Sequence, residues 1–271
     1  MKTVLVTGAT QGIGLHTALR LAQAGNHHVV LHGRTAESGE AAMARIRSES
    51  GARKENFSLV TGDLSDLMQV RGVADQVKEK VDGLDVLINN AGVFADEQRQ
   101  TSADGYELTF AVNVLAPFAL TKLLLPAMNR NGHVINTSSL SAQGKVPWED
   151  LQLERAYSNH KAYSLSKLLI QSFTYALHRR FLDGAEYGGR GLKTNTLDPG
   201  TVDTRMLRKG WAMSGIPLET ADDTFKLATN PDPPKGKYFV GNRLTAPVGG
   251  ARPREDQERL WEILEGMCRD L

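Results

Sequence analysis

A tyrosine and a lysine four positions apart form the pair in this sequence that is best suited to acid–base catalysis. Tyr163 and Lys167 stand in the run Tyr-Ser-Leu-Ser-Lys, at the start of a helical pattern that continues to about Phe181. Residues four apart lie on the same face of a helix, so the phenol and the ammonium can converge. A nearby ammonium stabilises a phenolate and lowers the pKa of the tyrosine, which makes this tyrosine a candidate general acid for a carbonyl oxygen.

A second pair with the same spacing, Tyr157 and Lys161, lies six residues closer to the N-terminus. The spacing alone is common, and a tyrosine and a lysine on the exposed face of a helix would match it equally well. Which of the two tyrosines is catalytic therefore depends on the residues around them.

A glycine-rich turn near the N-terminus predicts a site for a dinucleotide. The first apolar run leads into Thr-Gly-Ala-Thr-Gln-Gly-Ile-Gly, which places Gly8, Gly12 and Gly14 before a helical pattern. Glycine lets the backbone turn tightly and approach a pyrophosphate closely, and the helix N-terminus then presents free N–H groups to the phosphates. The GxxxGxG spacing differs from the commoner GxGxxG. A plain structural turn is the alternative.

The residue that follows the second apolar run indicates which dinucleotide is bound. NAD binders place an acidic residue about twenty positions beyond the turn, where it accepts hydrogen bonds from the ribose 2′-hydroxyl. This sequence has Arg34 twenty positions after Gly14, and no acidic residue occurs before Glu37. A guanidinium pairs well with a 2′-phosphate, so we expect NADP(H), with a solvated surface arginine as the alternative.

A bound NADP(H) would also affect the pKa of the candidate acid, Tyr163. Lowering the pKa of Tyr163 by two to three units takes about 3–4 kcal/mol of differential stabilisation. We expect Lys167, beside a bound nicotinium ring, to supply that stabilisation.

Seven apolar runs predict the strands that must position these residues. Most are nearly continuous in Val, Ile and Leu, as expected of strands buried on both faces, and helical patterns separate them. This alternation predicts an α/β fold: a single-domain Rossmann fold with a doubly wound parallel sheet of about seven strands and helices on both faces. The runs are Thr3–Thr7, His28–His32, Phe57–Thr61, Leu84–Asn89, His133–Thr137, Leu192–Leu197 and Lys237–Val240.

The composition is that of an ordinary globular protein of 271 residues, with 41% hydrophobic and 23% charged residues. The net charge of +1 gives no reason to expect nucleic acid or a membrane as a partner. The single cysteine, Cys268, suits a reducing compartment, and no signal-peptide pattern precedes the first strand pattern, so we expect a cytoplasmic protein. The seven histidines show no metal-ligand spacing, and no metal is expected.

We expect one domain over residues 1–271. Its cofactor half would cover about 1–140, and its catalytic and substrate half about 141–271. Glycine-rich and proline-rich stretches occur in the second half, and we interpret them as turns because no linker-like composition accompanies them.

Further motifs, in order along nearly the whole chain, resemble the short-chain dehydrogenase/reductase family in its classical form. The glycine turn is similar to the family's TGxxxGxG, and Asn-Asn-Ala-Gly at 89–92 is similar to its NNAG motif. Residues 134–139 resemble the strand that carries the catalytic serine. Pro199 and Gly200 resemble the motif that closes on the nicotinamide. Together these motifs are highly specific for the family.

The resemblance implies a catalytic tetrad of Asn113, Ser139, Tyr163 and Lys167. Ser139 would hold the carbonyl oxygen, Tyr163 would donate the proton, and Lys167 would lower the pKa of the tyrosine and bind the nicotinamide ribose. Asn113 would hold a water that leads to the lysine. The residues expected to bind NADP(H) are Gly8, Thr10, Gln11, Gly12, Ile13, Gly14, Arg34, Thr35, Asp63, Leu64, Asn90, Ala91, Gly92, Tyr163, Lys167, Pro199, Gly200, Val202 and Thr204.

The separation of Ser139 and Tyr163 exceeds that in many family members, which keeps Tyr157 in contention. Tyr163 is favoured because residues 162–168 resemble the family's usual AYxxSKL. The inserted segment 148–157 resembles the branch that holds retinol dehydrogenases and protochlorophyllide reductase-like enzymes, and that branch largely prefers NADPH.

We therefore expect an NADPH-dependent carbonyl reductase or alcohol dehydrogenase that acts on a small-molecule substrate. A catalytically silent NADP-binding regulatory protein on the same fold is the alternative, although all four residues of the tetrad are present. An epimerase or dehydratase of the extended type fits less well, because that type usually carries TGxxGxxG and a longer C-terminal substrate domain. Fold alone decides none of these.

A homodimer or homotetramer would pair through the helices that carry the catalytic asparagine and tyrosine, as the resemblance implies. An aliphatic face around Leu123, Leu124, Leu168 and Phe173 would serve that purpose. The same face would equally well pack within one chain.

Overall fold

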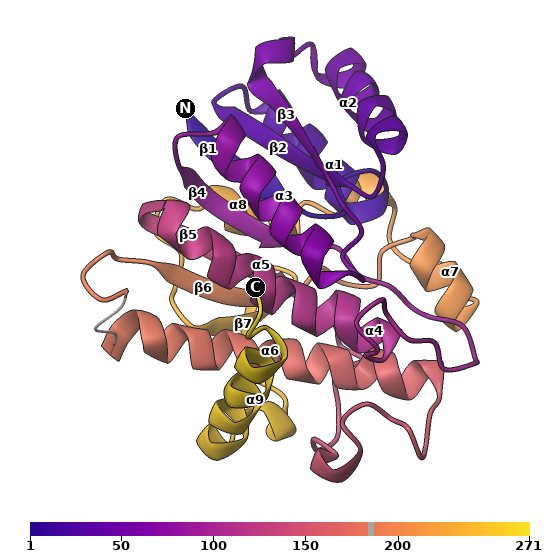
Figure 1. Cartoon of the computed structure of the whole chain (residues 1–271). Coiled ribbons are helices and arrows are strands. Elements are labelled where there is room, and N and C mark those ends of the chain that lie inside the picture. Colours follow the sequence, from indigo (N-terminus) through magenta and orange to yellow (C-terminus); the bar gives the residue numbers. More distant parts are fainter. Residues whose placement is uncertain (184–186) are drawn as a thin grey trace.

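Within residues 1–183 and 187–271, which the computed structural model describes, the chain forms an eight-stranded sheet covered by helices (Figure 1). The strand order is β3-β2-β1-β4-β5-β6-β7-β8. Neighbouring strands pair in parallel up to β7, and β8 is antiparallel to β7. The strands are β1 (Lys2–Val6), β2 (His27–Gly33), β3 (Phe57–Thr61), β4 (Leu84–Asn89), β5 (Met128–Thr137), β6 (Lys193–Asp198), β7 (Lys237–Val240) and β8 (Arg243–Thr245).

Helices cover both faces of the sheet because successive side chains of a strand point to opposite faces. In β1, Leu5 packs into one core, whereas Val4 and Val6 pack into the other. The first core lies beneath α3 (Leu67–Lys80), α4 (Leu108–Phe110), α5 (Ala116–Leu124), α6 (Asn159–Asp183) and α9 (Arg254–Met267). The second lies beneath α1 (Gly12–Gln23), α2 (Ala36–Ser50) and α8 (Asp223–Thr229), while α7 (Arg205–Trp211) contains no buried residue.

The predicted fold class is confirmed, and the seven predicted runs coincide with β1 to β7. Their ends agree within one residue except in β5, which begins at Met128 because the exposed residues 129–131 extend the strand without an apolar pattern. The apolar pattern does not indicate β8, a three-residue strand whose side chains are exposed. The division into two halves near residue 140 stays a prediction.

One segment of the first core is long and apolar enough to cross a membrane, by length and composition alone. It covers Leu108–Ala127, and 83% of its most apolar stretch is buried inside the fold. A helix that is apolar all round is expected where protein surrounds it, as it does here between the sheet and the neighbouring helices.

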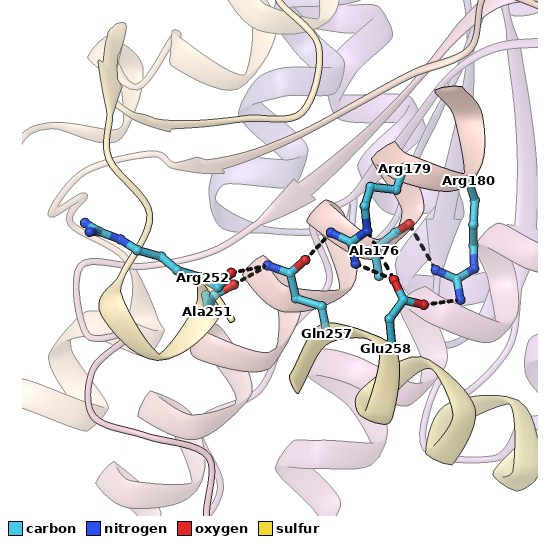
Figure 2. Close-up of polar contacts among 7 residues, drawn as sticks. All are labelled: Ala176, Arg179, Arg180, Ala251, Arg252, Gln257 and Glu258. Atoms are coloured by element: carbon cyan, nitrogen blue, oxygen red, sulfur yellow. Dashed lines mark hydrogen bonds and ion pairs between the residues drawn. The ribbon is translucent and has the colours of Figure 1, made fainter. Parts of the chain in front are cut away.

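The C-terminal helix α9 is joined to α6 by charged and polar side chains. Figure 2 shows Arg179 and Arg180 of α6 converging on Glu258 of α9, and the Arg180 Nη2 to Glu258 Oε2 distance is 2.8 Å. The Gln257 amide accepts a hydrogen bond from Arg179 and donates one to the carbonyl oxygen of Ala251 at 2.6 Å. Because one carboxylate binds two guanidinium groups, α9 has a defined register against α6.

The apolar side of α9 covers the outer surface of α5 and α6. The Trp261 ring meets the Phe118 ring edge-on at 5.0 Å and stacks with the Phe173 ring at 6.1 Å. Leu124, Leu168 and Phe173 are at most 1% exposed. The greater part of the aliphatic face considered for pairing is therefore packed within the chain, and α9 braces α6, which carries Tyr163, and α5, which directly follows the turn with Asn113.

We expect Trp261→Ala to destabilise the fold by about 3–5 kcal/mol, because removal of a buried indole leaves a cavity between three helices. Glu262→Ala, at the next and exposed position of α9, should change the free energy of unfolding by less than about 0.5 kcal/mol. Urea unfolding measures both variants. A loss below about 1 kcal/mol for Trp261→Ala would mean that α9 does not unfold together with the core.

Candidate active site

A cavity of about 570 Å³ opens where the carboxyl ends of the parallel strands meet. In an open α/β sheet, ligands bind at this edge, close to the point where the strand order reverses. Here the order reverses between β1 and β4. The wall of the cavity contains the glycine turn as well as Ser139, Tyr163 and Lys167, so the expected dinucleotide residues and the expected catalytic residues share one space.

Of the residues expected to bind or catalyse, only Thr35 and Asn113 lie outside the lining of this cavity. The Thr35 hydroxyl instead caps α2 by accepting a hydrogen bond from the backbone N–H of Ser38 at 3.3 Å. Conversely, the lining includes His32 and Asp198, which were not among the residues expected to bind or catalyse. Each stands at the end of an apolar run, and only the parallel arrangement of the strands brings them to the site.

Backbone conformation at two positions and close packing at a third favour glycine in the glycine turn. Gly8 and Gly12 have φ values of +64° and +56°, a region that glycine tolerates best. A Cβ on Gly14 would lie 2.4 Å from both the carbonyl oxygen of Gly8 and the side-chain Nδ2 of Asn90. The first turn of α1 has no side-chain cap and no acidic residue. Its backbone N–H groups, at the cavity wall, suit the phosphates of a dinucleotide.

His32 holds the glycine turn from behind. Its Nδ1 accepts a hydrogen bond from the backbone N–H of Gly8 at 3.2 Å, and its Nε2 lies 3.0 Å from the carbonyl oxygen of Gly62. Burial lowers the pKa of His32, although the hydrogen bond to Gly62 and the Asp63 carboxylate oppose this. Because a carbonyl oxygen only accepts, we assign the proton to Nε2 of a neutral imidazole.

Arg34 extends from the end of β2 into the cavity wall. Its side chain is 70% exposed, and its Nε lies 3.7 Å from Oδ2 of Asp63. The other Asp63 oxygen accepts hydrogen bonds from the backbone N–H and the hydroxyl of Ser65. An exposed ion pair of this length contributes little free energy. The guanidinium can therefore turn to bind a phosphate.

Tyr163 and Lys167 lie on one face of α6, as the spacing predicts. The Lys167 ammonium donates a hydrogen bond to the carbonyl oxygen of Thr137 at 2.8 Å and lies 5.4 Å from the centre of the Tyr163 ring. Both side chains are buried, at 7% and 4% exposure. The helix presents phenol and ammonium to the cavity side by side.

Burial dominates the acid–base properties of this pair. It raises the pKa of Tyr163 to about 12, although a hydrogen bond with Ser139 lowers it. It lowers the pKa of Lys167 to about 8, against the attraction of the Asp198 carboxylate. Lys167 by itself therefore does not bring the tyrosine below its ordinary pKa. The lower pKa of Tyr163 that the sequence predicts therefore needs a second positive charge, that of a bound nicotinium ring.

Two adjacent serines at the end of β5 have different roles. The Ser138 hydroxyl is 2% exposed, donates to the carbonyl oxygen of Lys167 at 3.0 Å and accepts from the Gln171 amide at 3.0 Å. The Ser139 hydroxyl accepts from the backbone N–H of Ser141 at 3.1 Å. It also hydrogen-bonds the Tyr163 phenol, so the second serine lies beside the candidate acid at the cavity wall.

Asn113 lies behind the cavity, in one turn of π-helix that covers Ala111–Leu115. Its Oδ1 accepts from the backbone N–H of Val93 at 2.8 Å, and its Nδ2 donates to the Val93 carbonyl oxygen and to the Ser166 hydroxyl, each at 3.0 Å. The side chain therefore ties residues 90–96, the segment after β4, to α6. The expected water on Asn113 stays a prediction.

The competing pair does not converge on the cavity. Tyr157 lies outside the lining, and its hydroxyl donates to the backbone carbonyl of Asp96 at 3.1 Å. The Lys161 ammonium donates instead to the carbonyl oxygen of Ala156 at 3.1 Å. Tyr157 thus contacts the backbone of the segment after β4, and the assignment of Tyr163 as the acid stays a prediction.

The same segment after β4 supports α7 at the edge of the cavity. The Lys209 ammonium lies 2.6 Å from Oδ1 of Asp96. The Trp211 ring contacts the Phe94 ring at 5.0 Å and the Tyr163 ring at 5.2 Å. α7 therefore presents an aromatic wall next to the phenol.

No metal centre accompanies these groups: across residues 1–183 and 187–271, no three His, Cys, Asp or Glu side chains are grouped so that they could hold an ion. The lining residues bear the donors and small side chains of a nucleotide site instead.

Comparison with known proteins places this geometry in a family. Residues 2–215 match the family described as short chain dehydrogenase. The chain is similar to retinol dehydrogenase 13 from Homo sapiens, with 36% identity over 96% of this chain and 82% of that protein. It is similar to polyprenol dehydrogenase from Mus musculus, with 35% identity over 96% of this chain and 82% of that protein.

Solved structures agree with this relationship. An uncharacterised protein from Mycobacterium paratuberculosis superposes with a TM-score of 0.81 at 30% identity, covering 99% of this chain and 94% of that one. A short chain dehydrogenase from Burkholderia cenocepacia in complex with NADP superposes with a TM-score of 0.68 at 25% identity, covering 93% and 98%.

We expect Gly14→Ala to destabilise the fold by about 1–3 kcal/mol and to weaken dinucleotide binding, because the added methyl group meets Gly8 and Asn90. Gly72→Ala is the matched control: it makes the same change inside α3, where a Cβ meets nothing within 4 Å. It should stabilise the fold by about 0.5–1 kcal/mol. Urea unfolding and dinucleotide titration measure both. Equal stability and affinity of the two variants would contradict the close approach.

Proposed function

The chain belongs to the short-chain dehydrogenase family, and we propose that it is an NADP(H)-dependent oxidoreductase that interconverts an apolar alcohol and its carbonyl compound. One observation carries the proposal: Ser139, Tyr163 and Lys167 line the same cavity as the glycine turn. A proton donor, an oxygen-binding hydroxyl and a phosphate-binding turn in one space are what hydride transfer to a carbonyl requires.

The residues of the cavity fit NADP(H). The space that a Cβ on Gly14 would fill is already taken by Gly8 and Asn90, so the first turn of α1 packs tightly against the ends of the strands, as a dinucleotide-binding turn requires. Arg34, at the end of β2, offers an exposed guanidinium for the 2′-phosphate. A similar structure was solved with NADP. When bound, the nicotinamide supplies or accepts the hydride.

The residues of this chain move the proton and hold the substrate. Tyr163 gives its phenolic proton to the carbonyl oxygen in reduction, and takes it from the alcohol in oxidation. Ser139 orients the same oxygen with its hydroxyl and stabilises the charge that develops there. Lys167 stabilises the phenolate that remains. Asn113 acts through the backbone of Val93 and positions the wall of the site.

The mouth of the cavity supports an apolar substrate. Leu140 and Met213 line it and are 62% and 48% exposed, and Trp211 supplies an aromatic wall beside Tyr163. Exposed apolar side chains that gather at a cavity mark a binding surface. The relatives are named for retinol and polyprenol, both apolar isoprenoid alcohols. We propose a substrate of that class.

Three further expectations accompany this proposal and stay predictions. They are a cytoplasmic location, the absence of a membrane partner, and assembly into a homodimer or homotetramer. Such an assembly would have to use a surface other than the buried residues Leu124, Leu168 and Phe173.

Exchange of the two tyrosines for phenylalanine tests the catalytic assignment. Tyr163→Phe should lower kcat for NADPH-dependent reduction of retinal and of a longer isoprenoid aldehyde by at least about 100-fold, because it removes the general acid. Tyr157→Phe is the matched control and should retain wild-type kcat. The consumption of NADPH is followed, with quinones and small ketones completing the panel. Loss of activity in Tyr157→Phe alone would assign the catalytic role to Tyr157. Tight NADPH binding without any turnover would favour a regulatory protein.

Exchange of Arg34 tests the cofactor preference. Arg34→Ala should weaken NADPH binding about 10- to 100-fold and leave NADH binding nearly unchanged, because only NADPH carries the 2′-phosphate. Arg45→Ala is the control, since Arg45 is an exposed arginine on α2 that pairs with Glu49. Fluorescence titration of both dinucleotides gives the affinities. Equal losses for the two dinucleotides would contradict phosphate recognition by Arg34.

A further inference from the structure

Asp198 is a buried carboxylate in the wall of the cavity, and the proton transfer described above does not use it. It ends β6, is 3% exposed and lines the cavity together with Tyr163 and Lys167. Removal of a carboxylate from water is costly unless hydrogen bonds or an opposite charge compensate it. The compensating groups therefore indicate what the residue does.

The two Asp198 oxygens bind the backbone of two different segments. One accepts a hydrogen bond from the N–H of Leu140 and the other from the N–H of Gly200. Leu140 directly follows Ser139, and Gly200 belongs to the turn after β6. The carboxylate consequently fixes the segment that carries the catalytic serine relative to the turn that closes the cavity.

The sheet register places the same carboxylate on the strand next to the one whose end binds the Lys167 ammonium, and the two charges interact. Lys167 binds the carbonyl oxygen of Thr137, and Thr137 pairs with Leu197 on the neighbouring strand. Asp198 is the next residue along that strand. The pKa directions agree with this placement: burial lowers the pKa of Lys167 and raises that of Asp198, and each group's charge opposes the shift of the other.

We propose that Asp198 is a positioning residue of this site, which holds Ser139 in place through the Leu140 amide and provides the buried countercharge of Lys167. The inference rests on the proposed function insofar as it concerns turnover. Among the residues that the structure describes, the Asp198 charge also acts on Tyr163 of α6 and Tyr238 of β7, and in both it adds to the increase in pKa that burial causes.

The pH profile of Asp198→Asn distinguishes this role from a merely structural one. An amide cannot accept hydrogen bonds at both ends, so kcat for aldehyde reduction should fall about 10- to 100-fold. Without the negative charge, Lys167 and Tyr163 both lose their protons at lower pH. Because reduction needs both groups protonated, the alkaline limb of the curve of kcat against pH should move to lower pH by about one unit or more. A structural defect alone would lower kcat and leave the limb in place.

Titration of Lys167 by NMR of protein labelled at lysine Cε provides a readout that needs no turnover. It separates a failure of this inference from a failure of the proposed function. The pH at the midpoint of the Lys167 titration should be lower in Asp198→Asn than in the wild type. It should be unchanged in Asp232→Asn, whose side chain is 95% exposed. Asp198→Ser repeats the comparison if the asparagine variant does not fold. An unchanged Lys167 midpoint in a folded variant, or an alkaline limb that does not move, overturns the proposal.

Discussion

Lys167 is 4% exposed, and its ammonium stands in an environment where a charge without partners would cost several kcal/mol. Its compensating groups, the Thr137 carbonyl and the Asp198 carboxylate, stand at the ends of β5 and β6. The charge can therefore be buried only where α6 and these two strands keep one relative position. That same position brings the Tyr163 phenol and the Ser139 hydroxyl together, so the burial of one charge and the assembly of the site are the same structural requirement.

A chain of buried amides and hydroxyls between the sheet and the helices supports this position. Asn136 of β5 donates to Thr174 of α6 at 3.0 Å, and Asn89 of β4 donates to Asn136 at 2.8 Å and to Thr121 of α5 at 3.1 Å. Apolar contacts tolerate small sliding motions, whereas a buried donor needs its particular acceptor. We infer that these bonds specify the register of α5 and α6 on the sheet, while α9 braces the two helices from outside.

The two tyrosines show that the same four-residue spacing from a lysine can occur in two different structural environments. Tyr163 and Tyr157 each precede a lysine by four residues. Tyr163 lies on α6 in the cavity wall, whereas Tyr157 precedes the helix and binds the backbone of Asp96. The inserted segment that raised the question of a second acid thus stabilises the segment after β4, which in turn supports Asn113 and α7.

The sequence by itself determined the fold class, the seven parallel strands, and the set of glycines, Arg34, Ser139, Tyr163 and Lys167 as candidates for one site. The strands, the glycine turn and the Tyr163–Lys167 pair are encoded locally, because apolar periodicity, the need for glycine in a tight turn and the spacing of a helix face depend on neighbours in the chain. Ser139 was identified only through the family resemblance of the motif that contains it. Tertiary structure alone decided that Thr35 caps a helix, that His32 holds the glycine turn and that Asp198 and Lys167 line the same cavity. It also decided that the pKa of Tyr163 rises on folding, because burial and charge are set by residues brought together from distant parts of the sequence.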